Sequence, residues 1–295
     1  MRLSQMNMTR RLDHKVRRVW AVLRLAAKTF SRIDGVQWAG SFAFNAFFAL
    51  FPLMILVVAL ASTIMDRDRA GKAIIVYIES YVPIGGEMQS YIFDTIAGVV
   101  KARGQAGVVA FLILIWVVLQ CFTTLICATN RAWGTTVHAW WRLPLKSLVL
   151  LGLTAGASLL GMTLTVMMRM SKSWLYTVSD FHSWIYAQAR LFIPLVVVFL
   201  SLSVFYRLAP RRPMRFAQVW AAALCATALL QIAESLFAIY LKDFATLNAV
   251  YGAFGGTMAL LLWVYLSGCI FIFGACLCAA QAEERSASLA TGMAN

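Results

Sequence analysis

The chain has 295 residues, of which 61% are hydrophobic and only 13% are charged. Soluble domains carry about 25% charged residues, so this composition and a mean hydropathy of +0.76 exclude an ordinary soluble protein and predict several membrane crossings. The formal net charge of +14 would suggest a nucleic-acid-binding protein if the chain were soluble. In a membrane protein it is the distribution of charge that matters, so we expect the lipid bilayer as partner and no nucleic acid.

Residues 1–34 carry nine Lys or Arg against two acidic residues. Apolar side chains recur at helical spacing within residues 10–32: Val16, Val19, Trp20, Leu23, Ala26, Ala27 and Phe30. Because basic residues occupy the other faces, residues 1–34 are predicted to form a cytoplasmic amphipathic helix that lies on an anionic inner leaflet. A nucleic-acid-binding arm is the alternative, but it gives the apolar stripe no role.

Six segments are apolar enough to cross a bilayer, which takes about 20 helical residues. They cover residues 38–65, 107–129, 148–168, 191–208, 217–241 and 255–280. The predicted fold is therefore all-α, with one six-helix transmembrane domain at residues 35–282 and a cytoplasmic tail at residues 283–295. Residues 66–105 are too long for a turn and predict two short amphipathic helices on the outer face, broken at Pro83.

The charge of the connections predicts the orientation of the chain. Residues 66–105 hold five basic and five acidic residues, whereas residues 131–146 hold three basic residues and no acid, and residues 207–216 hold four arginines. Because basic loops stay in the cytoplasm, both termini are predicted to be cytoplasmic in a plasma membrane. Residues 169–190, with three basic residues against one acid, discriminate poorly.

The first segment contains "FAFNAFFALFPL" at residues 42–53. Small and polar residues fall on one helical stripe, which lets another helix come close: Ser41, Asn45, Ala49 and Pro52. Phenylalanines occupy a neighbouring stripe and are predicted to face lipid or bulky neighbours. Asn45 is therefore predicted to hydrogen-bond at a helix interface, in a structural role.

Polar residues in the spans define a candidate intramembrane site: Asn45, Gln120, Arg190, Gln231 and Glu234. Glu234 lies roughly 7–8 Å beyond the middle of its segment at 1.5 Å per residue, where an unpaired carboxylate costs at least about a few kcal/mol. We therefore expect Glu234 to face the interior, either protonated or paired, with Arg190 as the preferred partner. A structural ion pair and a substrate- or proton-linked role are both open.

Basic residues at the inner ends of the spans define a second candidate site: Arg131, Arg207, Arg211, Arg212 and Arg215. They either set the topology or hold anionic headgroups. Asn130, beside Arg131, is a candidate cap for the end of its helix. Leading into the last segment, Tyr251, Gly252, Gly255 and Gly256 permit a tight turn, a close helix approach or a hinge.

No pattern of catalytic residues is found. Metal-dependent hydrolysis needs clustered His, Asp or Glu, but His14, His138 and His182 lie in separate connections. The six cysteines form no CxxC pair and fit as small apolar residues at helix interfaces. A GxSxG nucleophile motif and a phosphate-binding P-loop are also missing. We therefore expect no enzyme, no catalytic residue, no metal and no cofactor.

Three stretches together resemble the YihY/BrkB family of membrane proteins. They are "WAGSFAFNAFFALFPLMI" (38–55), "ATNRAWG" (128–134), and "FYRLAPRRPMRFAQVWAAAL" (205–224) followed by "NAVYGAFGGTMALLLWVYLSGCIFIFGA" (248–275). The resemblance implies six spans in a bacterial inner membrane. Some members carry the label ribonuclease BN, and others are linked to serum resistance or to envelope lipids. The chain departs from the family's pattern at Asn45, often an aromatic residue, and at Cys276, often a glutamate.

Two classes of function fit these observations. The first is transport or translocation of an envelope component such as an anionic lipid. The second is a non-enzymatic membrane scaffold or assembly factor, for which a second copy or an envelope protein would be the partner. A groove that reaches Asn45, Gln120, Gln231 and Glu234 would favour transport, and a dry, packed bundle would favour the scaffold.

Overall fold

The computed structural model describes residues 17, 19–64, 103–135, 142–174, 181–211, 214, 216–244 and 248–293. Within these ranges the chain is helical apart from short turns, and no strand occurs in them. The predicted all-α class is thus confirmed. Several predictions fall outside the described residues. They concern the outer helices in residues 66–102, the N-terminal residues 1–16, and the side chains of Arg212 and Arg215.

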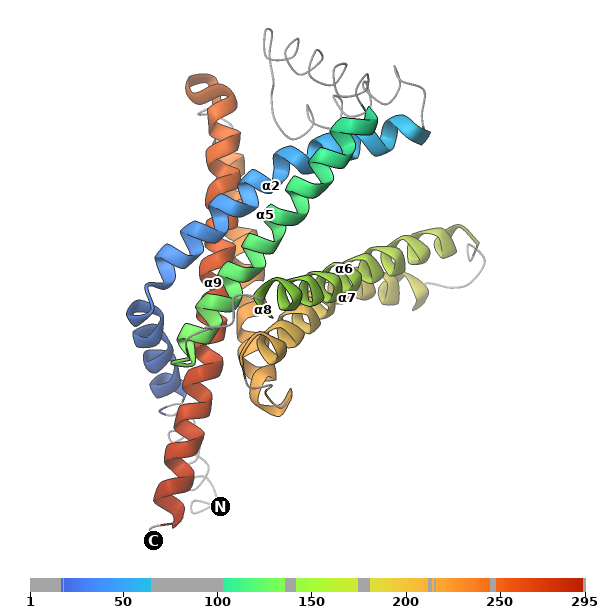
Figure 1. Ribbon diagram of the computed structural model, residues 1–295. Coiled ribbons are helices and arrows are strands. Elements are labelled where there is room, and N and C mark those ends of the chain that lie inside the picture. Colours follow the sequence, from blue (N-terminus) through green and yellow to red (C-terminus); the bar gives the residue numbers. More distant parts are fainter. Residues whose placement is uncertain are drawn as a thin grey trace. The chain divides into compact units, whose positions relative to one another are not determined.

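Six long helices follow a shorter N-terminal helix (residues 19–32) in the described part of the chain (Figure 1). They are α2 (Gly35–Ile64), α5 (Arg103–Ala132), α6 (Arg142–Trp174), α7 (Phe181–Leu208), α8 (Phe216–Phe244) and α9 (Asn248–Met293). Each predicted span falls inside one of them, except for Met65, which is outside the described residues. Every helix is longer than its predicted span, and in all of them except α2 the added ends include charged residues.

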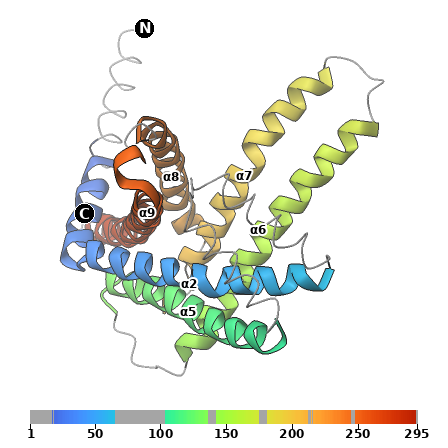
Figure 2. The same cartoon turned by 90° about the horizontal axis from the view of Figure 1, so that it is seen from above.

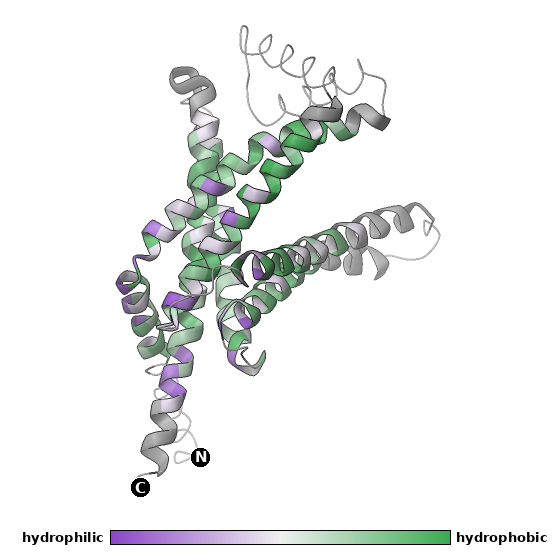
Figure 3. Ribbon diagram, viewed as in Figure 1, coloured by the Kyte–Doolittle hydropathy of each residue, from purple (hydrophilic) through white to green (hydrophobic). Residues whose placement is uncertain are grey.

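Five of these helices are long and apolar enough to cross a membrane. Their apolar stretches are Gly35–Leu60, Gly107–Ala132, Leu143–Gly161, Gln218–Leu241 and Gly255–Ser286. In α7 the apolar stretch is shorter, at Phe192–Leu208. The membrane class is therefore supported, while the sixth span stays a prediction. Figure 3 shows apolar residues along most of α2 and α5, and polar residues gathered in the N-terminal helix and late in α9.

The chain divides into two compact units. Unit 1 comprises residues 1–38, 125–231 and 269–295, and unit 2 comprises residues 39–124 and 232–268. Helices α2, α5, α8 and α9 each contribute one part to each unit. Unit 1 contains the pair α6 and α7, which run side by side in both views (Figures 1 and 2). Their approach is close at Gly161, where an added Cβ would lie 2.7 Å from a methyl group of Val197.

The N-terminal helix belongs to unit 1 and packs through one narrow face. Val22, Ala26 and Thr29 are buried on that face. Val19 and Trp20, which the sequence places on the apolar stripe, are 59% and 69% exposed. Part of the predicted apolar stripe therefore packs against the protein, at Ala26 and Phe30, while Val19 and Trp20 at its start are left exposed.

A tight turn joins the N-terminal helix to α2. Asp34 has a φ of 57°, and its carbonyl accepts hydrogen bonds from the N–H groups of Gln37 and Trp38 in the first turn of α2. The ring of Phe30 lies against Gly35, where it leaves no room for a Cβ. Phe30 also packs edge-on against Phe273 of α9, with ring centroids 6.2 Å apart. Glycine at position 35 thus lets the turn close on this aromatic contact.

Unit 2 is built on α2 and α5, which run side by side in both views (Figures 1 and 2). A Cβ at Gly107 would lie 3.4 Å from the methyl group of Ala59. Small residues also bring α9 close to α2, since a Cβ at Gly268 would meet the ring of Phe42 at 2.9 Å. The side chains of Phe44, Phe48 and Phe51 are exposed along one side of α2, as expected of side chains that face lipid.

Candidate functional site

Asn130, near the end of α5 in unit 1, is fully buried and forms four side-chain hydrogen bonds. Its Nδ2 donates to the carbonyls of Ile126 (2.8 Å) and Ala209 (3.1 Å). Its Oδ1 accepts from the backbone N–H of Arg211 (3.0 Å) and from the hydroxyl of Thr135 (3.3 Å). The side chain therefore ties the end of α5 to the loop that follows α7.

Two backbone hydrogen bonds, one nested inside the other, close the C-terminal end of α5. Gly134 has a φ of 66° and its N–H donates to the carbonyl of Arg131 (2.9 Å). The N–H of Thr135 donates to the carbonyl of Asn130 (3.0 Å). This is the Schellman arrangement, which favours glycine at the left-handed position. The backbone carbonyl of Asn130 thus accepts one of the two bonds that end the helix. Its side chain bonds instead to Ala209 and Arg211, in the loop that follows α7.

Lys146, near the start of α6, holds the same loop from another side. Its Nζ donates to the carbonyls of Ala209 (2.7 Å) and Pro210 (2.9 Å). From the sequence, Lys146 is one of three basic residues in the connection at residues 131–146 and contributes only to the predicted topology. A basic residue at the start of an apolar helix can indicate a structural hydrogen bond, but it does not specify a partner that lies 63 residues away.

Three arginines surround the loop that Asn130 and Lys146 hold. Arg207 is in the last turn of α7, Arg211 is in the loop and Arg131 follows Asn130, and all three side chains are exposed. The guanidinium of Arg131 lies 5.3 Å from the ring centroid of Trp38. We call Arg131, Arg207 and Arg211, with the backbone of residues 209–211, the arginine platform. It brings together three of the five predicted headgroup residues.

Beside the platform, the end of α7 is anchored to α9. Tyr206 is 1% exposed, and its hydroxyl donates to the carbonyl of Phe271 (2.8 Å). The ring of Phe205 meets the ring of Phe271 edge-on, with centroids 4.5 Å apart. The tyrosine hydroxyl fits only because Gly274 has no side chain. Arg207, the next residue, is therefore held on a well-packed helix end.

The predicted intramembrane site is only partly assembled. In unit 2 the Nδ2 of Asn45 lies 3.5 Å from Thr124 Oγ1, which itself donates to the carbonyl of Gln120 (2.9 Å). Thr124 thus contacts the side chain of Asn45 and the backbone of Gln120, whereas the side chain of Gln120 is exposed. A single long hydrogen bond supports the predicted structural role of Asn45 at a helix interface.

Glu234 and Gln231 differ from the prediction. Both side chains are exposed on α8, so the expectation that Glu234 faces the interior is wrong for this structure. The physical reason is that helical spacing shows which residues share a face, but does not show whether that face meets another helix. Arg190 lies in α7, but its side chain is outside the described part, so the proposed pair with Glu234 stays a prediction.

The glycines that lead into the last predicted span lie inside a helix. α9 begins at Asn248, so Tyr251, Gly252, Gly255 and Gly256 occupy its first turns rather than a turn that precedes it. Continuous backbone hydrogen bonding in α9 accounts for this difference. Among the described residues, no group of three His, Cys, Asp or Glu side chains is placed to hold a metal ion. Cys276, at the position where the resemblance suggests glutamate, is fully buried.

The sequence model of a family described as "Virulence factor BrkB" matches residues 26–294. The chain belongs to this family. UPF0761 membrane proteins of Prosthecochloris aestuarii and Photobacterium profundum are each 26% identical to it, over 88% and 86% of the chain. A UPF0761 membrane protein of Chlorobium phaeobacteroides is 27% identical over 88%.

The BrkB family match confirms the resemblance seen in the sequence motifs, and the relatives agree that this is a membrane protein. The chain covers 60% of the Prosthecochloris relative, 78% of the Photobacterium relative and 60% of the Chlorobium relative. It therefore spans less than two thirds of two of the three. No solved structure matches the chain.

Proposed function

We propose that this BrkB-family protein binds anionic lipid headgroups at the arginine platform and translocates an anionic lipid, or a similar envelope component, across the bacterial inner membrane. The observation that carries the proposal is the fixed loop at residues 209–211. Asn130 and Lys146 hold its backbone with four hydrogen bonds, two from each side chain. A loop that already has its bound shape loses less conformational entropy when a ligand arrives.

The chemistry of the platform suits a phosphate. Arginine presents planar N–H donors that match phosphate oxygens, and each basic residue near an anionic leaflet contributes about 1 kcal/mol of attraction. Under this proposal the platform and both termini are cytoplasmic, where the basic connections belong. No enzymatic step, metal or cofactor is part of the proposal, because binding and movement of a lipid require none.

A scaffold or assembly factor is the second candidate, and the exposure of Gln231 and Glu234 favours it. Both residues lie within the apolar stretch Gln218–Leu241, on the surface of α8. In this proposal a protein partner, either a second copy or another envelope protein, packs on this exposed face of α8.

The proposal is tested with the full chain in liposomes and a panel of fluorescently labelled lipids. We expect protein-dependent translocation of anionic lipids and a much slower rate for zwitterionic ones. Because two arginines contribute about 2 kcal/mol, Arg207→Gln with Arg211→Gln should lower anionic-lipid binding by roughly tenfold or more. Arg103→Gln with Lys242→Gln removes the same charge from helix ends that are predicted to face the opposite side of the membrane, and it serves as the matched control.

Two outcomes decide between the candidates. If folded protein translocates no lipid of the panel, the transport proposal is wrong. If Glu234→Leu dissociates an oligomer while the monomer stays folded, the scaffold is favoured, because the carboxylate then belongs to an interface between chains. Glu283→Leu, on the exposed end of α9, controls for the loss of charge alone.

A further inference from the structure

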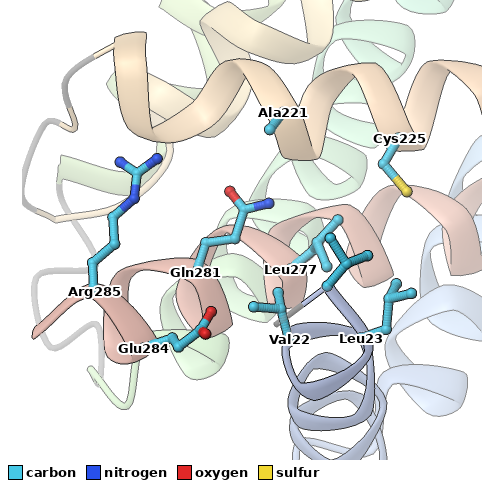
Figure 4. A pocket seen from close by; sticks show the side chains of 9 residues that line it. Val22, Leu23, Ala221, Cys225, Leu277, Gln281, Glu284 and Arg285 are labelled. Carbon is cyan, nitrogen blue, oxygen red and sulfur yellow. The ribbon is translucent and has the colours of Figure 1, made fainter. Parts of the chain in front are cut away.

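Unit 1 contains a pocket of about 400 Å³ between the N-terminal helix, the first part of α8 and the last part of α9 (Figure 4). Its volume falls in the range of about 300–1,000 Å³ that is usual for small-molecule sites. One end is apolar and is formed by Val22, Leu23, Ala221, Cys225 and Leu277. The other end carries Gln281, Glu284 and Arg285. The pocket is thus amphipathic, and none of the residues discussed so far as candidate sites lines it.

The polar end presents two acceptors and one cation from a single helix. Gln281, Glu284 and Arg285 are three and four residues apart on α9, so they share one side of the helix. Figure 4 shows the Gln281 amide directed across the pocket towards α8. The Oε1 atom of Gln281 is buried and accepts no hydrogen bond within the described part of the chain. Such an atom is costly unless a donor reaches it, so it marks the place for a ligand N–H or O–H.

The pocket also lies near the ends of two apolar stretches that are long enough to cross a membrane. Ala221 and Cys225 lie in the apolar stretch Gln218–Leu241, and Leu277 lies in Gly255–Ser286. Arg285 is one residue before the end of the second stretch, and the eight residues from Leu277 to Arg285 span roughly 12 Å along the helix. An amphiphile in the pocket therefore has its apolar part at the level of the hydrocarbon and its head at the level of the headgroups.

We infer that this pocket binds one phospholipid whose head carries both a phosphate and a primary ammonium, the phosphoethanolamine class. The guanidinium of Arg285 receives the phosphate. The ammonium donates to Gln281 Oε1 and to the carboxylate of Glu284, and an acyl chain follows Val22, Cys225 and Leu277. This inference concerns a resident lipid that joins the N-terminal helix to α8 and α9, and it does not depend on lipid translocation.

Charge complementarity selects this head over the two common alternatives. A choline head has the same phosphate and the same positive charge but no N–H, so Gln281 Oε1 stays without a donor. A glycerol head has hydroxyl donors but no cation, so its net negative charge faces the carboxylate of Glu284. Only a head with both a phosphate and an N–H-bearing cation gives Gln281 Oε1 a donor and also presents a group of complementary charge to Arg285 and to Glu284.

The test measures lipid binding to the delipidated full chain in detergent by native mass spectrometry. Phosphatidylethanolamine, phosphatidylcholine and phosphatidylglycerol with identical acyl chains are the probes. Because a buried acceptor that is left without a donor weakens binding, we expect phosphatidylethanolamine to bind roughly tenfold more tightly than the other two. Ala221→Phe fills the pocket and should abolish the site, whereas Leu224→Phe, at a 54% exposed position of the same helix, should not.

Changes at the polar end test the headgroup assignment without filling the pocket. Gln281→Leu and Glu284→Gln should each reduce the preference for phosphatidylethanolamine over phosphatidylcholine. Glu283→Gln, an adjacent exposed carboxylate outside the pocket, should leave that preference unchanged. If Ala221→Phe does not fold, these three variants decide. Equal affinities for the three lipids, tighter binding of phosphatidylglycerol, or an equal effect of Glu283→Gln would each overturn the inference.

Discussion

Two asparagines in apolar helices show how differently the same side chain can be used. Asn130 is fully buried and bonds to Ile126, Ala209, Arg211 and Thr135. Asn45 is half-buried and makes one 3.5 Å contact with Thr124. The first side chain fixes a loop, while the second supports a helix contact that small residues already provide. The energetic consequence of removing each should differ accordingly.

We predict that Asn130→Ala lowers the free energy of unfolding by about 2–3 kcal/mol, because buried partners such as the Ala209 carbonyl and the Arg211 N–H lose a hydrogen bond. Asn45→Ala should cost less than about 1 kcal/mol, the net value of one ordinary hydrogen bond. Unfolding of both variants in the same detergent measures the difference. Equal losses would show that the bonds of Asn130 do not hold the loop.

At this scale the sequence located residues but not their partners. Asn130 was recognised at the end of its helix, yet its bonds to Ala209 and Arg211 cross 79 and 81 residues. Glu234 was placed correctly within a span, and its predicted inward direction was wrong. Local spacing determines the face on which a side chain lies, and only the packing of helices determines what that face meets.

Between elements, glycines set how closely helices approach. At Gly274 of α9 an added Cβ would overlap the hydroxyl of Tyr206 on α7 and lie 3.0 Å from the Cβ of Ala226 on α8. At Gly152 and Gly156 of α6, no atom lies within 4 Å of the same Cβ position. Glycine is thus required by packing at position 274, and it is replaceable at position 156.

We predict that Gly274→Ala destabilises the protein by about 1–3 kcal/mol, the usual cost of overpacking. Gly156→Ala should be neutral or stabilise by up to about 1 kcal/mol, because alanine is the better helix former. Thermal unfolding in detergent distinguishes the two changes.

A second substitution tests the cause of that loss. Tyr206→Phe removes the hydroxyl that the new methyl group overlaps, so the double variant with Gly274→Ala should be less destabilised than the sum of the single changes. Additive losses would mean that the overlap is relieved elsewhere, and that the two residues do not limit the approach of α7 and α9.

For the molecule as a whole, α7 decides the topology. Its 28 residues are long enough for a span, but its apolar stretch is confined to Phe192–Leu208. If α7 crosses the membrane, the number of spans is even and both termini lie on one side. If it does not, five spans remain and the termini lie on opposite sides.

We predict six crossings, because the connections at residues 131–146 and 207–216 are both basic and belong on the cytoplasmic side. Reporter domains fused to the N-terminus and to the C-terminus should therefore both report the cytoplasm. A reporter inserted in residues 66–105 should report the opposite side. Termini on opposite sides would remove α7 from the set of spans.

The sequence alone determined the membrane class and the helical fold, and it located the five apolar stretches that are long enough to cross a membrane. These features depend on stretches of about 20 apolar residues, which are local in the chain because a bilayer accepts a helix that satisfies its own backbone hydrogen bonds. The order of the motifs also indicated the family. No long-range contact was needed for any of these conclusions.

Only the tertiary structure determined which polar groups meet. The hold of Lys146 on residues 209 and 210, the link from Asn45 through Thr124 to the backbone of Gln120, and the pocket beside Gln281 all join distant parts of the chain. In an apolar helix most faces look alike in sequence, since lipid and neighbouring helices both accept apolar side chains. The choice between them is made when helices pack, and that choice created the arginine platform and the amphipathic pocket.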